Sequence, residues 1–305
     1  MAPCLRVSRR PTLRSGALAM ALGLLATAFA GTVHAEGTLD KIKRRGQVNV
    51  GYRVDAAPFS YNDAQGNPVG YSLDICNEAV EKLRSQMGGA ELHVKLVPVD
   101  MDRVLRFVSE GAIDLLCSST SDTPARRQQM AFSKPIFLDG VGVMVRAKDR
   151  VAGVAELRGK EVVAIKASTA VTTLQAYGQK QAMEWKVEPA LNADAALSAL
   201  ELGWAAGYAR DAVPLAMQRA VLPNAQDYVL LPDRLSVETI AIAMPAGDEA
   251  LRNFINTVIT EGAAAGKVQA LYARWFTQPI TVGGKQATLG IPLSEELKTT
   301  FKVSN

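Results

Sequence analysis

The sequence has few of the residues that most metal, redox and hydrolytic sites require. It contains two histidines and three cysteines among 305 residues, and no CxxC pair. Beyond residue 35 the single histidine is His93, so a site built from several histidines is excluded from that part of the chain. We therefore expect neither a metal ion nor a cofactor.

A hydrophobic run long enough to span a membrane is also missing. The apolar stretch 17–30 is short for a bilayer-crossing helix. Arginines precede it, and Val33-His34-Ala35 follows it as a cleavage site, an order typical of a secretory signal peptide. An uncleaved anchor helix is the alternative. We expect cleavage after Ala35 and a periplasmic mature protein.

No excess of positive charge remains once this leader is set aside. The chain holds 34 basic and 30 acidic residues, and residues 1–35 contain four of the basic and none of the acidic ones. No basic stripe that would follow a phosphate backbone is present, so we expect no nucleic-acid partner.

Two cysteines, Cys76 and Cys117, lie beyond the leader. An exported protein permits a disulfide, but the contexts LDICNEAV and DLLCSST are apolar and typical of buried thiols. We expect two buried thiols, with a disulfide as the alternative.

The remaining chain alternates between strand and helix patterns and has no internal repeat. This alternation predicts an α/β fold with parallel strands. Trp204 is assigned to the core. The expected strands are 47–51, 92–96, 113–117, 141–145, 162–165, 205–208 and 240–244, and the longer expected helices are 72–87, 172–181, 192–202, 211–220 and 249–276. The tail after Pro279 is expected to be extended.

Hydroxyl groups gather where the strand 113–117 ends, in SSTSDTPARR (118–127). Ligands of open α/β sheets bind beyond the carboxyl ends of the strands. Pro124 suits the first turn of a helix, whose free N–H groups favour an anion. Arg126 or Arg127 would add a bidentate grip on a carboxylate. The loop predicts a carboxylate receptor, with an ordinary capped turn as the alternative.

A second strand, in AAGYARD (205–211), ends in Asp211 where a helix is expected to begin. Asp211 can be a helix cap. A carboxylate that faces a carboxylate receptor across a cleft would instead complement a zwitterion. A third strand end, IKAST (165–169), supplies further hydroxyl and N–H groups.

In their order and spacing, six segments resemble the periplasmic amino-acid-binding proteins of ABC importers (solute-binding protein family 3), and most closely their glutamate/aspartate-binding branch. The segments are LDKIKRRGQVNVGYR (39–53), APFSYNDAQGNPVGYSLDICNEAV (57–80), SSTSDTPARRQQMAFSKPIF (118–137), ELRGKEVVAIKAST (156–169), YARWFTQPI (272–280) and PLSEELKTTFK (292–302).

The resemblance implies two α/β lobes joined by two crossovers, near 137–139 and 236–239, with the ligand cleft between the lobes. The expected parts are a signal peptide (1–35), a discontinuous first lobe (36–138 plus 239–305) and a second lobe (139–238). It also implies a monomer that is not an enzyme and that delivers its ligand to an ABC permease in the inner membrane.

The resemblance further implies a role for each site residue. Arg126 would bind the α-carboxylate of the ligand, and Asp211 its α-ammonium group. Arg53 would hold a side-chain carboxylate. The remaining expected site residues are Ser119 and Ser121 of the first lobe, Ser168 and Thr169 of the second, and Tyr52 beside Arg53. Phe59 also flanks Arg53, but aromatic residues near strand ends more often pack in the core, with cleft lining as the alternative.

The sequence departs from the branch at three positions. Val104 stands where a second arginine is expected, with Arg103 one residue away and turned aside on the helix. Ala193 replaces a histidine, and Ala167 replaces a glycine. We therefore expect an α-amino-acid ligand, either glutamate or aspartate or a related polar amino acid.

Two other classes of protein remain open. A few relatives are dehydratases of arogenate or prephenate, which would need a general acid such as Asp55 or Asp211. A hydrolase would have to use His93, which is expected to face solvent. A free-standing sensor lobe would use the same cleft.

Overall fold

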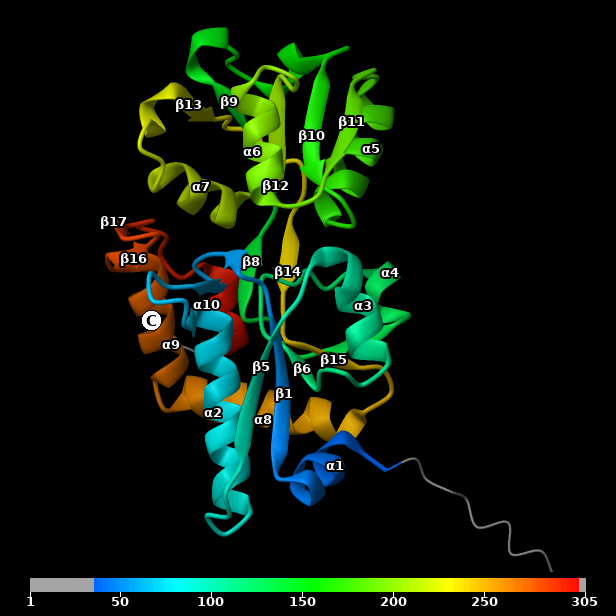
Figure 1. The fold of residues 1–305 in the computed structure, drawn as a ribbon, viewed down its shortest axis with the longest axis vertical. Coiled ribbons are helices and arrows are strands. Elements are labelled where there is room, and N and C mark those ends of the chain that lie inside the picture. Colours follow the sequence, from blue (N-terminus) through cyan, green and yellow to red (C-terminus); the bar gives the residue numbers. More distant parts are fainter. Residues whose placement is uncertain (1–35, 302–305) are drawn as a thin grey trace, which may run out of the picture. The chain divides into compact units, whose positions relative to one another are not determined.

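The computed structural model describes residues 36–301, and its two largest sheets have five strands each (Figure 1). In the first sheet β1 lies between β5 and β6 and is parallel to both. Arg53 follows directly at its carboxyl end. β15 returns antiparallel between β6 and β7. The strand order is β5 (His93–Pro98), β1 (Gln47–Tyr52), β6 (Leu115–Leu116), β15 (Ala243–Pro245) and β7 (Met130–Phe132).

The second sheet has the same strand number. Here β10 is parallel to β11 and β12, and β9 is antiparallel to β12 and β13. The order is β11 (Lys186–Ala190), β10 (Glu161–Ile165), β12 (Gly207–Asp211), β9 (Val141–Arg146) and β13 (Tyr228–Leu230). Its helices are α5 (Thr169–Gln181), α6 (Ala193–Glu201) and α7 (Ala212–Ala220).

Two chain segments connect the sheets and lie side by side. They are β8 (Phe137–Asp139) and β14 (Glu238–Ile240), which pair antiparallel (Figure 1). The expected two-lobed α/β fold with two crossovers is thereby confirmed. We propose that the lobes divide at residues 138 and 239, which leaves the first lobe discontinuous.

An aromatic cluster in the first lobe joins the crossover strand β8 to the helical turn at 273–277. Phe137 and Phe276 stack with ring centroids 4.4 Å apart, and Phe59 meets Phe137 edge-on at 5.1 Å. Phe59 is fully buried in this cluster, so it has the packing role and not the alternative role of lining the cleft. The helices of this lobe are α1 (Thr38–Arg45), α2 (Tyr71–Gln86), α3 (Met101–Ser109), α4 (Pro124–Arg127), α8 (Glu249–Ala264), α9 (Lys267–Tyr272) and α10 (Glu295–Phe301).

Three small features complete the described chain. A hairpin sheet follows β1, and a second hairpin precedes α10. Single helical turns occur at 147–149, 154–157, 225–227 and 273–277, and the hairpin strands are β2 (Asp55–Ala56), β3 (Ser60–Asn62), β4 (Pro68–Val69), β16 (Ile280–Val282) and β17 (Lys285–Ala287). Between residues 36 and 301 no helix combines the length and apolarity that a membrane span requires.

The two cysteines form a disulfide, so the expectation of two free thiols is wrong. Cys76 of α2 and Cys117, which follows β6, are both buried, with their Cα atoms 6.4 Å apart. An apolar sequence context indicates burial but does not distinguish a buried thiol from a buried half-cystine. The bond ties α2 to the strand that ends in the hydroxyl-rich loop.

Three further expectations need correction. Trp204 is 69% exposed rather than buried, because it follows a Gly203 turn of positive φ that carries it beyond the end of α6. The expected helix 249–276 is interrupted at Gly266, which has a φ of +76° that other residues rarely adopt. The tail is not simply extended, since it forms β16, β17 and α10. The predicted signal peptide lies outside the described residues.

Candidate functional site

The loop after β6 is unusually polar for a buried segment. Residues 118–121 are all at most 7% exposed, although each carries a hydroxyl group. Ser118 is used structurally, because its Oγ accepts from the Ser60 hydroxyl at 2.8 Å and its carbonyl accepts from Ser72 at 3.0 Å. The buried Ser119 Oγ has no hydrogen-bond partner within residues 36–301. A buried polar atom without a partner is costly, so the Ser119 hydroxyl would gain a hydrogen bond from a ligand beside it.

The turn that follows was predicted to be either a carboxylate receptor or an ordinary capped turn. Thr123 caps the single-turn helix α4, since its Oγ1 accepts from the Arg126 amide at 3.3 Å. The capped-turn alternative is therefore correct for Thr123. Such a short helix has a weak dipole, so any anion recognition here depends on side chains.

The structure separates the two adjacent arginines. Arg127 is exposed and makes a bidentate pair with Asp122 at 2.6 and 2.7 Å. Arg126 is more buried and donates one hydrogen bond, of 3.0 Å, to the Ser121 carbonyl. Burial lowers the pKa of Arg126, whereas the nearby carboxylates of Asp211 and Glu238 raise it. Arg126 is therefore the arginine of this turn whose pKa responds to a carboxylate of the second lobe, that of Asp211.

Asp211 does not cap the helix that it precedes. Its side chain makes no capping bond to α7, and it is 9% exposed. Asp139 of β8 takes that role instead, because its Oδ2 accepts from the Val213 amide at 3.1 Å. Burial raises the pKa of Asp211, and Glu238 raises it further, while Arg210, Arg53 and Arg126 oppose the rise. The carboxylate of Asp211 is thus left among charged groups of both lobes.

Glu238 belongs to this cluster and was missed in the sequence. Its Oε2 accepts from the Thr169 hydroxyl, and its Oε1 from the Ser236 hydroxyl, both at 2.8 Å. Thr169 is therefore engaged by a crossover strand, whereas the neighbouring Ser168 Oγ is buried and has no partner in the described chain. The only signal for Glu238 in the sequence was one acidic residue just before an apolar strand.

Arg53 lies at the other end of the site and is already paired. Its Nη2 is 2.7 Å from Asp55 Oδ1 and 3.0 Å from Oδ2, and it is 7% exposed. Its amide donates to the Ser60 hydroxyl at 3.2 Å. The neighbouring Tyr52 is also buried, and its hydroxyl bonds the Asn62 side chain at 3.1 Å.

Asp55 also contacts the second lobe. Arg210 of β12, itself fully enclosed, donates to the Asp55 carbonyl at 2.7 Å and places a guanidinium nitrogen 3.9 Å from the carboxylate. Burial alone would raise the pKa of Asp55, but Arg53, Arg210 and the Ala193 amide together bring it below its usual value. Asp55 is therefore an ionised carboxylate shared between the lobes.

A cavity of about 120 Å³ adjoins this pair, between the lobes. Its size suits a few non-hydrogen atoms of a side chain. Its lining combines the Arg53–Asp55 pair with mainly apolar and acidic residues: Val54, Val99, Asp100, Met101, Ile165, Leu191, Asn192, Ala193 and Asp194.

The three departures from the branch are visible in this region. Val104 is buried in a core cluster, and Arg103 instead pairs with Asp100 at the surface. Ala193 lines the cavity without a titratable group. Ala167 adopts a φ of +59°, a conformation that suits the expected glycine better.

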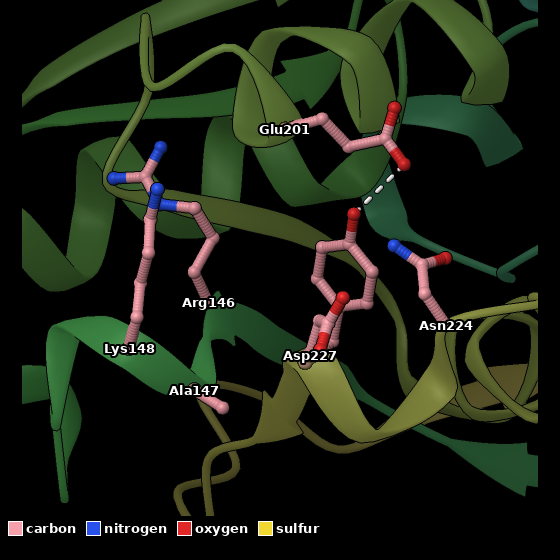
Figure 2. Close-up of a pocket in the computed structure, with 7 residues that line it drawn as sticks. Arg146, Ala147, Lys148, Glu201, Asn224 and Asp227 are labelled. Atoms are coloured by element: carbon pink, nitrogen blue, oxygen red, sulfur yellow. Dashed lines mark hydrogen bonds between the residues drawn. The ribbon is translucent and has the colours of Figure 1, made fainter.

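A larger cavity, of about 590 Å³, lies in the second lobe, and none of the predicted site residues lines it. The Tyr228 hydroxyl donates to Glu201 Oε1 at 2.7 Å. The dashed line at the labelled Glu201 in Figure 2 marks this bond. Arg146 on its opposite side donates to the Leu200 carbonyl at 2.6 Å and to Asp149 at 2.8 Å. These polar groups already have internal partners, in contrast to Ser119 and Ser168.

The family model for bacterial extracellular solute-binding proteins, family 3, matches residues 48–278. This chain belongs to that family. This family-3 protein is 29% identical over 297 residues to the "Glutamate/aspartate import solute-binding protein" of Escherichia coli (strain K12), covering 97% of each chain. It is 32% identical to the "L-glutamate/L-aspartate-binding protein" of Pseudomonas aeruginosa, covering 86% of each.

Solved structures agree with the fold of this family-3 protein. The P235GK mutant of ArgBP from T. maritima matches with a TM-score of 0.69 and 29% identity, covering 79% of this chain and 99% of that one. An ancestral arginine-binding protein bound to arginine matches with a TM-score of 0.68 and 26% identity, covering 76% and 99%. The predicted family resemblance is confirmed, and these relatives are binding proteins.

Proposed function

We propose that this family-3 protein is the solute-binding component of an amino-acid ABC importer. It binds an α-amino acid between its lobes and delivers it to a permease in the inner membrane. Glutamate, aspartate or a related polar amino acid is the expected class, in keeping with the names of the relatives. The protein acts in the periplasm as a monomer, after cleavage of the leader at Ala35.

The observation that carries this proposal is the pair formed by Arg126 and Asp211. One comes from each lobe, and each is within the electrostatic influence of the other. Within residues 36–301, neither Arg126 nor Asp211 forms a salt bridge like the one between Arg127 and Asp122. The Asp211 side chain also makes no capping hydrogen bond to α7. A cation and a carboxylate in one desolvated site complement the two charges of an amino acid.

Hydroxyl groups on both sides complete the proposed receptor. Ser119 and Ser121 would contact the ligand from the first lobe, and Ser168 and Thr169 from the second. The two unpartnered hydroxyls, Ser119 and Ser168, gain most from a ligand because each lacks a hydrogen bond in the described chain. Arg53 and Tyr52 would lie near the ligand side chain.

We propose that the protein is not an enzyme. A dehydratase would need a general acid that holds a proton near neutral pH. The pKa of Asp55 is lowered, which is the wrong direction for that role. Asp211, whose pKa is raised, is the one remaining candidate of the two. Since we propose that it binds the ligand ammonium group instead, incubation with prephenate or arogenate should leave both compounds unchanged. Release of a dehydrated product would contradict the binding-protein assignment.

Calorimetric titration of ligand-stripped, refolded protein tests the proposal. Amino acids with short polar side chains should bind. Two analogues of the tightest ligand provide matched controls: its 2-hydroxy acid lacks the ammonium group, and its amine lacks the α-carboxylate. Each should bind at least about 100-fold more weakly, because a buried charge loses its partner. Absence of binding by every amino acid, or equal binding of an analogue, would contradict the proposal.

A further inference from the structure

Asp55 changes what Arg53 can offer to a ligand. Both carboxylate oxygens of Asp55 lie within 3.0 Å of one guanidinium nitrogen of Arg53. A second carboxylate arriving from a ligand would have to share Arg53 with a carboxylate that is already ionised and close. Like charges at such short range disfavour each other, most strongly where solvent is excluded.

The charges around the proposed ligand are balanced without a ligand. Arg53, Arg126 and Arg210 are the cations that act on the acidic groups of the site. The carboxylates of Asp55, Asp211 and Glu238 oppose them. Asp139, adjacent to Asp211, has Arg234 at 3.4 Å as its own partner. A zwitterion with an uncharged side chain keeps this balance, whereas an additional carboxylate leaves one negative charge in excess.

The cavity beside Asp55 points the same way. Two further acids, Asp100 and Asp194, line it, and Arg53 is its single cationic lining residue. Arg103 pairs with Asp100 but is not itself a lining residue of the cavity. Apolar residues such as Ile165 and Leu191 form much of the remaining wall. An amide can accept from Arg53 and donate to Asp55 at once, while a carboxylate can only accept.

We propose that Asp55 is a specificity-determining residue that makes this site prefer an amide-bearing amino acid, such as glutamine or asparagine, over the corresponding acid. This inference rests on the proposed function, since it concerns the side-chain end of the same site. Asp55 also lies against Arg210 and the Ala193 backbone of the second lobe, so its position is fixed when the lobes are in contact.

The test is a set of calorimetric titrations near pH 7.5 with glutamine, glutamate, asparagine and aspartate. The parent protein should bind the tighter amide at least about tenfold more tightly than its acid, the effect of one unfavourable charge contact. Asp55→Asn should shift the acid-to-amide ratio of dissociation constants at least tenfold in favour of the acid. Asp55→Glu, which keeps the charge, should retain the parent preference.

Asp102→Asn provides the matched control. Asp102 forms another ion pair between the lobes, with Lys166, but it does not line the cavity. Its loss can weaken binding of all ligands, yet the acid-to-amide ratio should stay within threefold of the parent. This control separates a loosened contact between lobes from a change of charge at Arg53.

The possible outcomes are distinct. Acid bound as tightly as amide by the parent, or an unchanged ratio in Asp55→Asn, would overturn the role of Asp55 while leaving amino-acid binding intact. Failure of every amino acid to bind would instead contradict the proposed function. Should Asp55→Asn fail to fold, as judged by its thermal unfolding, the parent ratio and the Asp55→Glu variant still decide.

Discussion

The two ends of the proposed site differ in how far their charges are satisfied by the protein itself. At one end, Arg126 and Asp211 come from different lobes and each shifts the pKa of the other, and the serine hydroxyls of Ser119 and Ser168 have no partner in the described chain. At the other end, Arg53 is held by Asp55, and Asp55 is contacted by Arg210. At the first end two serine hydroxyls lack a partner in the described chain. At the second end the charges of Arg53 and Asp55 already satisfy each other, although the buried Arg210 Nε has no hydrogen-bond partner in the described chain.

This difference separates two tasks of the site. Every α-amino acid has the same carboxylate and ammonium groups, so an incomplete receptor for them supplies affinity without distinguishing one amino acid from another. A side chain is recognised by the difference in free energy between correct and incorrect ligands. Because Arg53 is already paired with Asp55, a charged ligand side chain gains less binding free energy from it. Arg53 therefore influences which amino acid is preferred and contributes little to the affinity for amino acids in general.

The largest effect is expected at the incomplete end. Arg126→Ala removes the partner of the α-carboxylate in a desolvated site, which should cost about 2–5 kcal/mol of binding free energy and abolish detectable binding. Thermal unfolding of the unliganded protein should change little. Calorimetry with the tightest amino acid measures the loss.

The neighbouring arginine provides the control for this change. Arg127→Ala removes an exposed residue of the same helical turn, paired with Asp122, and should leave affinity within about twofold of the parent because exposed ion pairs contribute little. Retained affinity in Arg126→Ala would contradict the proposed division between the two ends.

A smaller and ligand-dependent effect is expected at the paired end. Arg53→Ala should weaken binding of glutamate and aspartate by about 10–30-fold, but that of glutamine and asparagine by only about threefold, because only the acids lose a charge-assisted pair. Equal losses for acids and amides, or tight binding of lysine or arginine by the parent, would show that Arg53 does not read the side chain.

The last expected effect is on the stability of the unliganded protein, through Asp139. This residue caps α7 through its hydrogen bond with the Val213 amide, so Asp211 is not needed as the cap. Burial, and next the charge of Asp211, raise the pKa of Asp139 to about 7. The folded protein therefore holds this proton more tightly than the unfolded chain, in which the pKa is about 3.9. The resulting stability is complete below pH 4 and is lost as the pH rises through 7.

Urea unfolding of the unliganded protein at pH 5 and pH 8 measures this loss. The free energy of unfolding should fall by about 2–3 kcal/mol through Asp139, and Asp139→Asn should remove that fall. Asp233→Asn weakens a comparable bond, of 2.9 Å to the Val154 amide, and should preserve it. If the free energy of unfolding of Asp139→Asn falls between pH 5 and pH 8 as much as that of the parent, the pH dependence comes from other groups.

Sequence patterns predicted the fold well where an element is regular and one-sided. The helical periodicity of α2 and the apolar patterns of β1, β9 and β10 are set by residues close together in the sequence. The structure contains all four of these elements. The disulfide, the exposure of Trp204 and the break at Gly266 depend on packing between distant segments or on one backbone angle. No local pattern encodes such features.

The same distinction applies to the site. Arg126 and Asp211 could be proposed because both follow strand ends, where the topology of an open sheet brings residues together. Glu238 and Arg210 could not, since the role of each arises from a partner far along the chain, such as Thr169 for Glu238 and Asp55 for Arg210. No pattern in the sequence indicated that Asp55 would form an ion pair with Arg53.

A crystal structure of the protein with its tightest amino-acid ligand would show whether Arg126 and Asp211 bind the α-groups. We predict that the α-carboxylate lies within hydrogen-bonding distance of the Arg126 guanidinium, about 2.7–3.2 Å, and that the ammonium group lies at the same range from Asp211. Asp55 should remain paired with Arg53. A ligand bound outside the contact region of the two lobes, or held with its α-groups away from Arg126 and Asp211, would contradict this division of the site.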